Sequence, residues 1–353
     1  MHQLDDASFV LRNDPKGMYR LTTAFPDQIR EAVRIGQDAG IVPLSQVPRL
    51  AMLTGLGGSA AGGDFVRAMF EETGTIPFLV NRDYHLPAYV DANTLIFAVS
   101  YSGNTEETLS AYEDARRAGA RMVIVTSGGK LAEFGQADGY PVIRIPGGQP
   151  PRTALGFNLM PVIVACERMG LLPEQDYARL TDLLKACVGE WGIDTPFESN
   201  EAKQLAQKLF GKLSVLYGLG GWQALVANRW KGQINENAKN MTFANAFPEL
   251  CHNEILGWVK ANHQGVDRWV GVVLEDGTES EKMKARERVT SGLIKDVCDM
   301  HRAKARGGSL LERMLSLALL GDFVSLYLAA LNDVDPENID SINILKAELA
   351  NVP

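Results

Sequence analysis

Short apolar runs alternate with amphipathic segments along most of the chain. Four runs in the first half have the length and composition of buried strands: residues 50–53, 94–99, 121–126 and 140–145. The segment 105–118 has apolar positions at helical spacing. Short strands that alternate with helices are typical of βαβ units, so the pattern predicts a parallel sheet covered by helices.

An internal repeat extends the pattern into the second half. The sequence Leu-Thr-Gly-Leu-Gly-Gly-Ser at 53–59 recurs as Leu-Tyr-Gly-Leu-Gly-Gly-Trp at 216–222, an offset of 163 residues, about the size of one α/β domain. The later pattern predicts strands at 213–217 and 269–274, a helix at 279–291 and a long apolar helix at 310–331. We expect the long helix in the core or at a subunit interface.

The predicted fold is α/β, with two tandem, doubly wound parallel sheets of the flavodoxin-like kind. We expect an N-terminal domain at residues 1–153, a helical connection at 154–200 and a C-terminal domain at 201–353. Ligands of open α/β sheets bind at the carboxyl ends of the strands. The turns that follow the strands are therefore the places to look for a site.

One such turn, residues 100–108, is Ser-Tyr-Ser-Gly-Asn-Thr-Glu-Glu-Thr and joins a strand to a helix. Asn104 with Glu107 three residues later has the pattern of a capping box. A helix N-terminus offers unpaired N–H groups and a partial positive charge, and small hydroxyls add donors at short range. The turn is therefore suited to a phosphate dianion without lysine or arginine.

The turn at 54–63 is a second strand–turn–helix unit, rich in glycine. It fits the relaxed dinucleotide fingerprint, a weak match, and not the Walker loop. Since both turns end parallel strands, we expect them on one sheet edge. We assign phosphate binding to the hydroxyls and amides of Gly57, Gly58, Ser59, Ser100, Ser102 and Thr105. The alternative is that these residues only cap helices and turn the chain.

The repeat suggests one phosphate site per chain. In the second copy Trp222 stands where the first has Ser59, and a large aromatic ring there would block a phosphate. The hydroxyl-rich turn also has no counterpart in the second half.

Composition narrows the class of protein. The chain has 353 residues, with 46% hydrophobic and 22% charged residues, which is ordinary for a soluble globular protein. The net charge of −8 argues against nucleic acid as a partner, and we expect neither a membrane span nor a signal peptide. The scattered cysteines argue against a zinc site and disulfides and favour the cytoplasm; they are Cys166, Cys187, Cys251 and Cys298.

The two turns together resemble those of the sugar isomerase (SIS) domain superfamily, whose members bind phosphosugars. Three further segments, at 151–157, 235–239 and 248–254, resemble the bifunctional phosphoglucose/phosphomannose isomerases. The resemblance runs from about residue 20 to the C-terminus.

This resemblance implies an isomerase that interconverts glucose 6-phosphate and mannose 6-phosphate with fructose 6-phosphate through a cis-enediol, without metal or cofactor. It makes Glu236 the proton-transfer base and His252, supplied by the neighbouring subunit of a homodimer, the ring-opening residue. Lys346 would assist His252, Arg152 would stabilise the oxyanions and Glu254 would orient the histidine. On residue type alone, these positions also fit surface charges and a structural histidine.

Two other functions stay open. One is a phosphosugar-sensing protein without catalysis, although the chain shows no DNA-binding module. The other is an amino-sugar phosphate isomerase or deaminase. The sequence assigns no residue to the acceptance of mannose, because residues 335–340 contain no threonine.

Overall fold

The computed structural model describes residues 2–264, 268–349 and 351, and for Lys346 it describes the backbone alone. The chain forms two compact units. The first unit comprises Ala24–Lys185 and Gly307–Glu312. The second unit comprises Met1–Thr23, Ala186–Arg306 and Arg313–Pro353.

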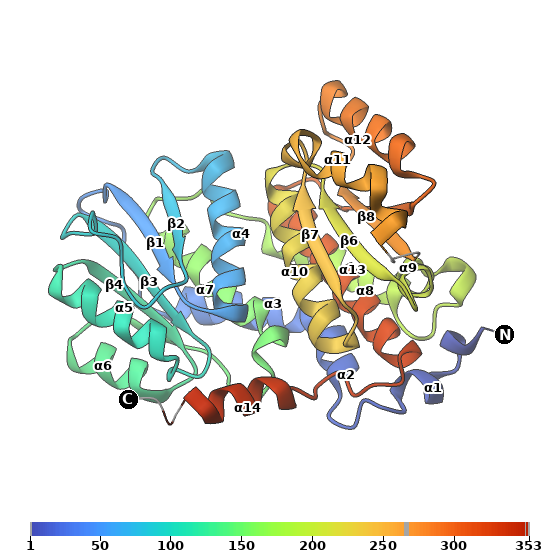
Figure 1. Ribbon diagram of the computed structural model, residues 1–353. Helices are drawn as coiled ribbons and strands as arrows, with labels where there is room; N and C mark the ends of the chain where they lie inside the picture. The colour runs from blue at the N-terminus through green and yellow to red at the C-terminus, as the bar shows by residue number, and fades with distance from the viewer. Residues whose placement is uncertain (1, 265–267, 350, 352–353) are drawn as a thin grey trace. The chain divides into compact units, whose positions relative to one another are not determined.

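The first unit is built on a parallel sheet of five strands in the order β2-β1-β3-β4-β5 (Figure 1). Its strands are β1 (Leu50–Thr54), β2 (Phe78–Asn81), β3 (Thr94–Ser100), β4 (Arg121–Thr126) and β5 (Val142–Arg144). Its helices are α3 (Phe25–Asp38), α4 (Gly57–Thr73), α5 (Glu106–Arg117), α6 (Gly129–Ala137), η2 (Pro151–Thr153) and α7 (Leu155–Arg168), and α8 (Tyr177–Trp191) ends in the second unit.

Helices cover both faces of this sheet. On one face, Tyr112 of α5 and Leu131 of α6 pack against Ile96 and Ile124 of the central strands. On the other face, Gly63 of α4 lies against Leu53 of β1, and α4 packs on α7. The predicted doubly wound α/β fold is therefore confirmed in this unit.

The second unit contains a parallel sheet in the order β7-β6-β8-β9 (Figure 1). Its strands are β6 (Leu213–Gly218), β7 (Thr242–Ala246), β8 (Trp269–Glu275) and β9 (Cys298–Lys304). Its helices are η1 (Gln3–Asp5), α1 (Ala7–Leu11), α2 (Met18–Thr23), η3 (Phe197–Ser199), α9 (Glu201–Leu209), α10 (Gly221–Ala238), η4 (Glu249–His252), α11 (Glu254–Gly257), η5 (Trp258–Gln264), α12 (Glu281–Ile294), most of α13 (Leu310–Leu331) and α14 (Asp340–Leu349).

The two sheets repeat one topology. Each places its first strand, β1 or β6, between the next two strands of the chain, and follows that strand with a glycine-rich turn and a long helix. The sequence repeat at 53–59 and 216–222 therefore marks equivalent places in the two sheets. By the same equivalence, the turn after β8 corresponds to the turn after β3.

Sequence reasoning missed β2, β7 and β9, which all lie at sheet edges. An edge strand buries less of its surface, so its sequence needs no continuous apolar run. β9 shows this plainly, since most of its residues are polar or charged. β5, another edge strand, is shorter than the predicted run at 140–145.

Helix α13 is a buried core helix, and most of it belongs to the second unit. It is long and apolar enough to span a membrane, but the apolar stretch is wholly buried within the protein, as in the core helix of a globular domain. It is the one such helix among the described residues. Of the two places expected for this segment, the core is confirmed.

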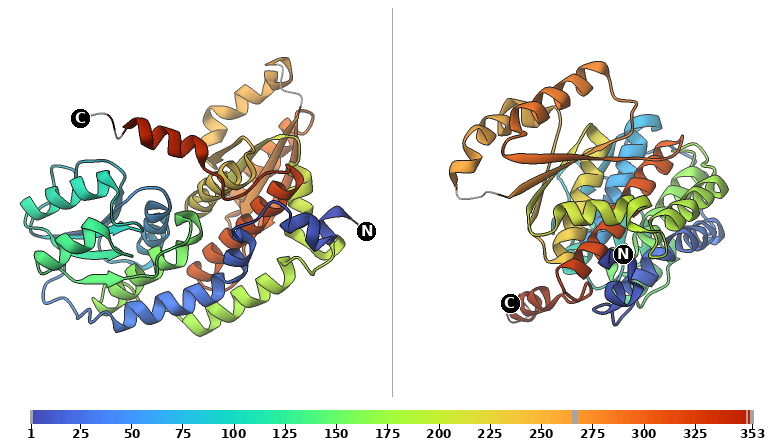
Figure 2. Two further views of the ribbon diagram at one scale, coloured as in Figure 1. Left: turned by 90° about the horizontal axis from the view of Figure 1, so that it is seen from below. Right: turned by 90° about the vertical axis from the view of Figure 1, so that its right-hand side faces the viewer.

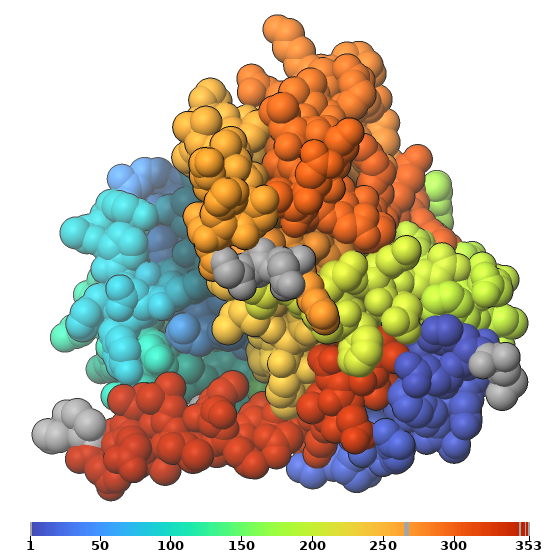
Figure 3. Space-filling model, turned by 45° about the vertical axis from the view of Figure 1, so that its right-hand side comes forward, coloured from blue at the N-terminus to red at the C-terminus, as the bar shows by residue number. Residues whose placement is uncertain are grey.

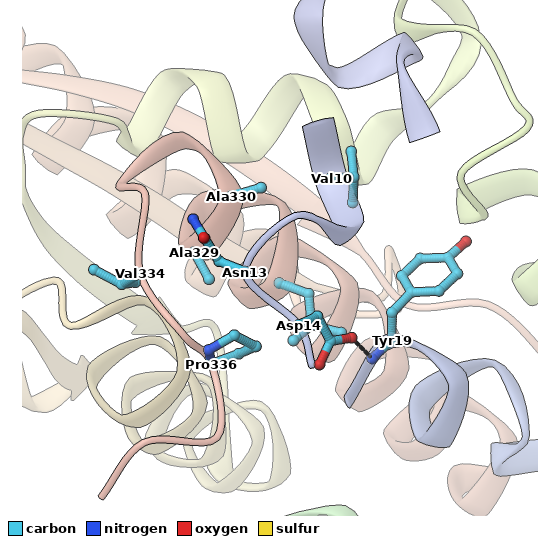
Figure 4. A pocket seen from close by; sticks show the side chains of 9 residues that line it. Val10, Asn13, Asp14, Tyr19, Ala329, Ala330, Val334 and Pro336 are labelled. Carbon is cyan, nitrogen blue, oxygen red and sulfur yellow. Dashed lines mark hydrogen bonds between the residues drawn. The ribbon is translucent and has the colours of Figure 1, made fainter. Parts of the chain in front are cut away.

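The N-terminal segment packs on α13 within the second unit (Figure 2). Tyr19 contacts the Phe323 ring, and the Asp14 carboxylate accepts hydrogen bonds from the amides of Met18 and Tyr19 at 2.7 and 2.8 Å. The seam between these segments leaves a cavity of about 10 Å³, room for one water (Figure 4).

Candidate active site

The hydroxyl-rich turn after β3 is a closed loop held by its own side chains. Ser100 Oγ lies 2.9 Å from Thr105 Oγ1 and accepts a hydrogen bond from the Gly103 amide at 3.1 Å. Gly103 has φ +71°, and a Cβ there would lie 1.8 Å from the Gly128 carbonyl oxygen. Only glycine fits this position.

The two predicted turns meet. Ser59 Oγ accepts a hydrogen bond from the Tyr101 amide at 3.3 Å, and both residues are buried. The register of β1 with β3, in which Thr54 pairs with Ala98, brings the carboxyl ends of these strands together. The prediction that both turns lie on one sheet edge is therefore confirmed.

The capping box predicted at Asn104 and Glu107 is wrong. The cap of α5 is Thr105, which makes no side-chain cap bond. Asn104 Oδ1 instead accepts from the Lys130 amide at 3.1 Å, because Gly129, at φ +68°, turns that loop back against it. The α4 cap, Leu56, has no polar side chain, so both helices present uncapped N-termini at this edge, as anion sites do.

Glycine lets a third segment approach these turns. Gly57 has φ +52°, and a Cβ at Gly58 would lie 2.7 Å from the Pro151 carbonyl oxygen and 3.7 Å from Arg152 Cα. η2 therefore packs against the first turn of α4, and it places the buried Arg152 there. Ser102 stands apart from the buried hydroxyls, because it is exposed and accepts from the Asn104 amide at 3.3 Å.

The other proposed catalytic residues belong to the second unit. Glu236 is half-buried in the last turn of α10, and His252 is exposed at the end of η4. Lys346 lies in α14, but its side chain is outside the described residues.

The segment that carries His252 is fixed to the sheet beneath it. The Glu254 carboxylate accepts from the Tyr217 hydroxyl and, at 2.5 Å, from the Asn245 amide. The Trp258 indole donates to the Tyr217 oxygen at 3.0 Å. We expected Glu254 to orient His252. Its two oxygens bind Tyr217 of β6 and Asn245 of β7, so it anchors the backbone that follows the histidine.

The surface next to His252 includes a shallow apolar groove. Cys251, Ile255 and Val289 are among its lining residues, and Cys251 Sγ lies 3.7 Å from Thr290 Oγ1. The segment 249–264 and the neighbouring helix α12 lie side by side on this surface (Figure 3).

The turn after β8 holds one of the protein's own carboxylates. Glu279 accepts from the amides of Asp276 and Gly277 at 2.7 and 2.9 Å, and from Gln223 Nε2 at 3.4 Å. Gln223 lies in the first turn of α10, one residue after Trp222. In the second sheet, the turn equivalent to the turn after β3 therefore binds a carboxylate of the protein itself.

Sequence reasoning missed Tyr217, Asn245 and Glu279. One signal was available for Tyr217, which occupies in the second copy the repeat position of Thr54 in the first. Asn245 and Glu279 lie in an edge strand and in a turn with no distinctive motif. Among the described residues, no cluster of three or more His, Cys, Asp or Glu could hold a metal ion.

Comparison with protein families matches both halves of the chain. Residues 44–135 match the SIS domain, and residues 198–349 match the bacterial phospho-glucose isomerase C-terminal SIS domain.

The chain is also similar to curated proteins over nearly its whole length. It is 42% identical to a bifunctional phosphoglucose/phosphomannose isomerase of Caldicellulosiruptor bescii, over 95% of this chain and 99% of that protein. It is 35% identical to the protein of the same name in Aquifex aeolicus, over 84% of this chain and 88% of that one.

A solved structure supports the fold. A hypothetical protein of Thermus thermophilus superposes with a TM-score of 0.71 at 17% identity, covering 98% of this chain and 93% of that one.

Proposed function

Because the chain belongs to the family of bifunctional phosphoglucose/phosphomannose isomerases, we propose that it interconverts glucose 6-phosphate and mannose 6-phosphate with fructose 6-phosphate. The observation that carries the proposal is the meeting of the two turns through the Ser59–Tyr101 hydrogen bond. It gathers hydroxyls and two uncapped helix N-termini at one sheet edge. That combination suits a phosphate monoester dianion.

In this proposal the first unit holds the phosphate. The hydroxyls of Ser59, Ser100, Ser102 and Thr105 and the amides of Gly57 and Gly58 act as donors. The buried position of Ser59 and Ser100 supports this assignment, because a charge-assisted hydrogen bond is stronger where water is excluded. Arg152, in η2 beside Gly58, would stabilise the negative charge that develops on O1 and O2.

Glu236 is proposed as the base. Its carboxylate takes the proton from C2 of the open-chain aldose, and an enediolate forms. The proton returns to C1 while the hydroxyl proton of O2 moves to O1, which gives the ketose. Glu236 is half-buried, and a carboxylate can act as a general base toward a carbon next to a carbonyl group.

His252 is proposed to open the sugar ring, with the help of Lys346. Imidazole can both give and take a proton near neutral pH. His252 is exposed, and Leu256 and Val259 close to it are also strongly exposed at 72% and 69%. This supports a homodimer in which the segment 249–264 contributes His252 to the neighbouring subunit's site.

We propose that the reaction uses neither metal nor cofactor and takes place in the cytoplasm. All four cysteines are free thiols, which suits a reducing compartment. The chemistry is proton transfer, so the named side chains suffice for it.

The test follows fructose 6-phosphate by NMR with the EDTA-treated protein and a Glu236→Gln variant. We expect glucose 6-phosphate and mannose 6-phosphate with the native protein, and no conversion with the variant. The variant should still bind a sugar-phosphate acid that resembles the enediolate.

The other outcomes point elsewhere. If glucose 6-phosphate were the sole product, the proposed activity toward mannose 6-phosphate would be wrong. Binding without conversion by the native protein would favour the sensing protein, and ammonia released from glucosamine 6-phosphate would favour the deaminase.

A further inference from the structure

We propose that Asn235 and Asn237 are positioning residues that hold the last turn of α10 from two sides and so direct the Glu236 carboxylate. The inference rests on the proposed role of Glu236 as the base. In this inference neither asparagine touches the reacting atoms, and each acts on the reaction through the position of Glu236.

Asn235 binds α10 to the edge of the sheet. Its Oδ1 accepts from the Thr242 amide at 2.9 Å, and its Nδ2 donates to the Thr242 carbonyl at 3.1 Å. The side chain therefore pairs with both backbone groups of one residue in β7, as a neighbouring strand would. Thr242 is itself fixed, because its hydroxyl lies 2.8 Å from the Ser214 hydroxyl in β6.

Asn237 binds the same turn to α13. Its Nδ2 donates to Ser325 Oγ at 2.9 Å, and Ser325 Oγ donates to the Asp322 carbonyl at 2.7 Å. Asn237 is 1% exposed and Ser325 is fully buried. Because separation would leave these buried polar groups with neither a partner nor water, this chain of hydrogen bonds resists displacement of the helix.

The two asparagines act in different directions. Successive residues of an α-helix are rotated by about 100°, so residues 235 and 237 project about 200° apart, with Glu236 between them. Either asparagine alone restrains the turn from one side only. Two nearly opposite contacts oppose rotation in either sense, and rotation is the motion that would carry the carboxylate away.

The contacts before and after this turn extend the restraint. Arg229 Nη2 lies 2.9 and 2.8 Å from the two Asp322 oxygens, and Gln233 Nε2 donates to Asp322 at 2.7 Å. Residues 229, 233 and 237 follow one another at four-residue spacing, so they share the face toward α13. Asn235 holds the opposite side of the helix, toward β7.

The end of the helix is bound as well. Lys239 Nζ donates to the Glu236 carbonyl at 2.8 Å and to the Asp335 carbonyl at 2.6 Å, and Asn332 donates to the Ala238 carbonyl at 2.8 Å. The last carbonyls of a helix are otherwise without intrahelical partners and prone to fraying. A base in the last turn of a helix therefore sits on a rigid support here.

The test compares Asn235→Ala, Asn237→Ala and Asn200→Ala. Asn200 is a matched control, because it is also buried, donates to the Gly192 carbonyl at 2.9 Å and accepts from the Lys203 amide at 3.1 Å, but lies outside α10. A base displaced by about 1 Å loses about a hundredfold in rate. We expect kcat to fall about ten- to a hundredfold in the two α10 variants, with KM for fructose 6-phosphate within about threefold.

Two measurements separate positioning from loss of fold. Ser325→Ala removes the acceptor of Asn237 without changing α10, and it should lower kcat in the same direction. Binding of the sugar-phosphate acid by all variants should stay within about threefold, since phosphate binding does not depend on the carboxylate geometry.

The outcomes distinguish this inference from the proposed function. Full activity of Glu236→Gln overturns the role of the base and the inference with it. An inactive Glu236→Gln with native kcat in Asn235→Ala and Asn237→Ala overturns the inference alone. Equal losses in Asn200→Ala also overturn it, because the loss of any buried asparagine would then lower the rate.

Discussion

The buried hydroxyl of Tyr217 donates its hydrogen to the carboxylate of Glu254. Burial raises the pKa of Tyr217, and the hydrogen bond to Glu254 raises it further, so the phenol stays protonated and remains a donor. Trp258 donates to the same oxygen. One hydroxyl thus joins β6 to both α11 and η5, the segments that follow His252.

Tyr217→Phe should therefore destabilise the protein. The substitution keeps the ring but leaves the Glu254 oxygen and the Trp258 indole without their partner, which should lower the free energy of unfolding by about 1–3 kcal/mol. Urea denaturation measures it. Tyr89→Phe is the control, because Tyr89 is 48% exposed, and it should change stability by less than about 0.5 kcal/mol. Equal effects of the two would contradict the role of the hydroxyl.

Gly58→Ala should disturb the junction of α4 with η2. The new Cβ would lie 2.7 Å from a backbone oxygen, which cannot move without shifting Pro151. We expect a loss of about 1–3 kcal/mol in unfolding free energy and weaker binding of fructose 6-phosphate. Gly189→Ala, in α8, meets no atom within 4 Å and should be neutral or slightly stabilising. A native KM and stability in Gly58→Ala would refute the close approach.

Ser100→Ala should weaken phosphate binding. A hydrogen bond to a charged group contributes about 1.5–3 kcal/mol, so KM and the dissociation constant for fructose 6-phosphate should rise at least tenfold. Titration calorimetry gives the dissociation constant. Ser110→Ala, on α5 beyond the turn, should bind as the native protein does. Unchanged affinity in Ser100→Ala would exclude this hydroxyl from the phosphate site.

Asp5 should contribute to acid sensitivity through its ion pair with Lys203. Burial acts to raise the pKa of Asp5, but hydrogen bonds from Lys203 and the Phe197 amide outweigh it and hold the pKa below its ordinary value of 3.8. A lowered carboxyl pKa stabilises the fold above the ordinary value, and this stability is lost as the pH falls through the folded-state value.

The difference in unfolding free energy between the native protein and Asp5→Asn should therefore be largest above about pH 4 and shrink on further acidification. Urea denaturation as a function of pH measures it. Asp27→Asn removes an ion pair with Arg30 in which both side chains are 63% exposed. It should change the unfolding free energy little at any pH. A constant difference for Asp5→Asn across the range would contradict the ion pair's contribution.

Much of the fold could be predicted from the sequence because the central strands are buried on both faces. The run at 121–126 and the helix at 310–331 match the structure at both ends. The edge strands β7 and β9 were not predicted, because they bury too little surface to require an apolar pattern. The strand order implied that Ser59 and Ser100 lie at one sheet edge, as they do, and their role in phosphate binding stays a prediction. The partner of Asn104 was missed because it depends on a loop 26 residues away.

The Glu279 carboxylate in the turn after β8 has a thermodynamic consequence. A turn that carries its own anion is satisfied before any ligand arrives, whereas the turn after β3 gains its anion only from solution. Ligand-linked stability, about 2.7 kcal/mol at a hundredfold excess over the dissociation constant, should therefore reach the fold through the turn after β3 and not through the turn after β8. Under substrate depletion the turn after β3 would lose this contribution, whereas the turn after β8 would keep its anion.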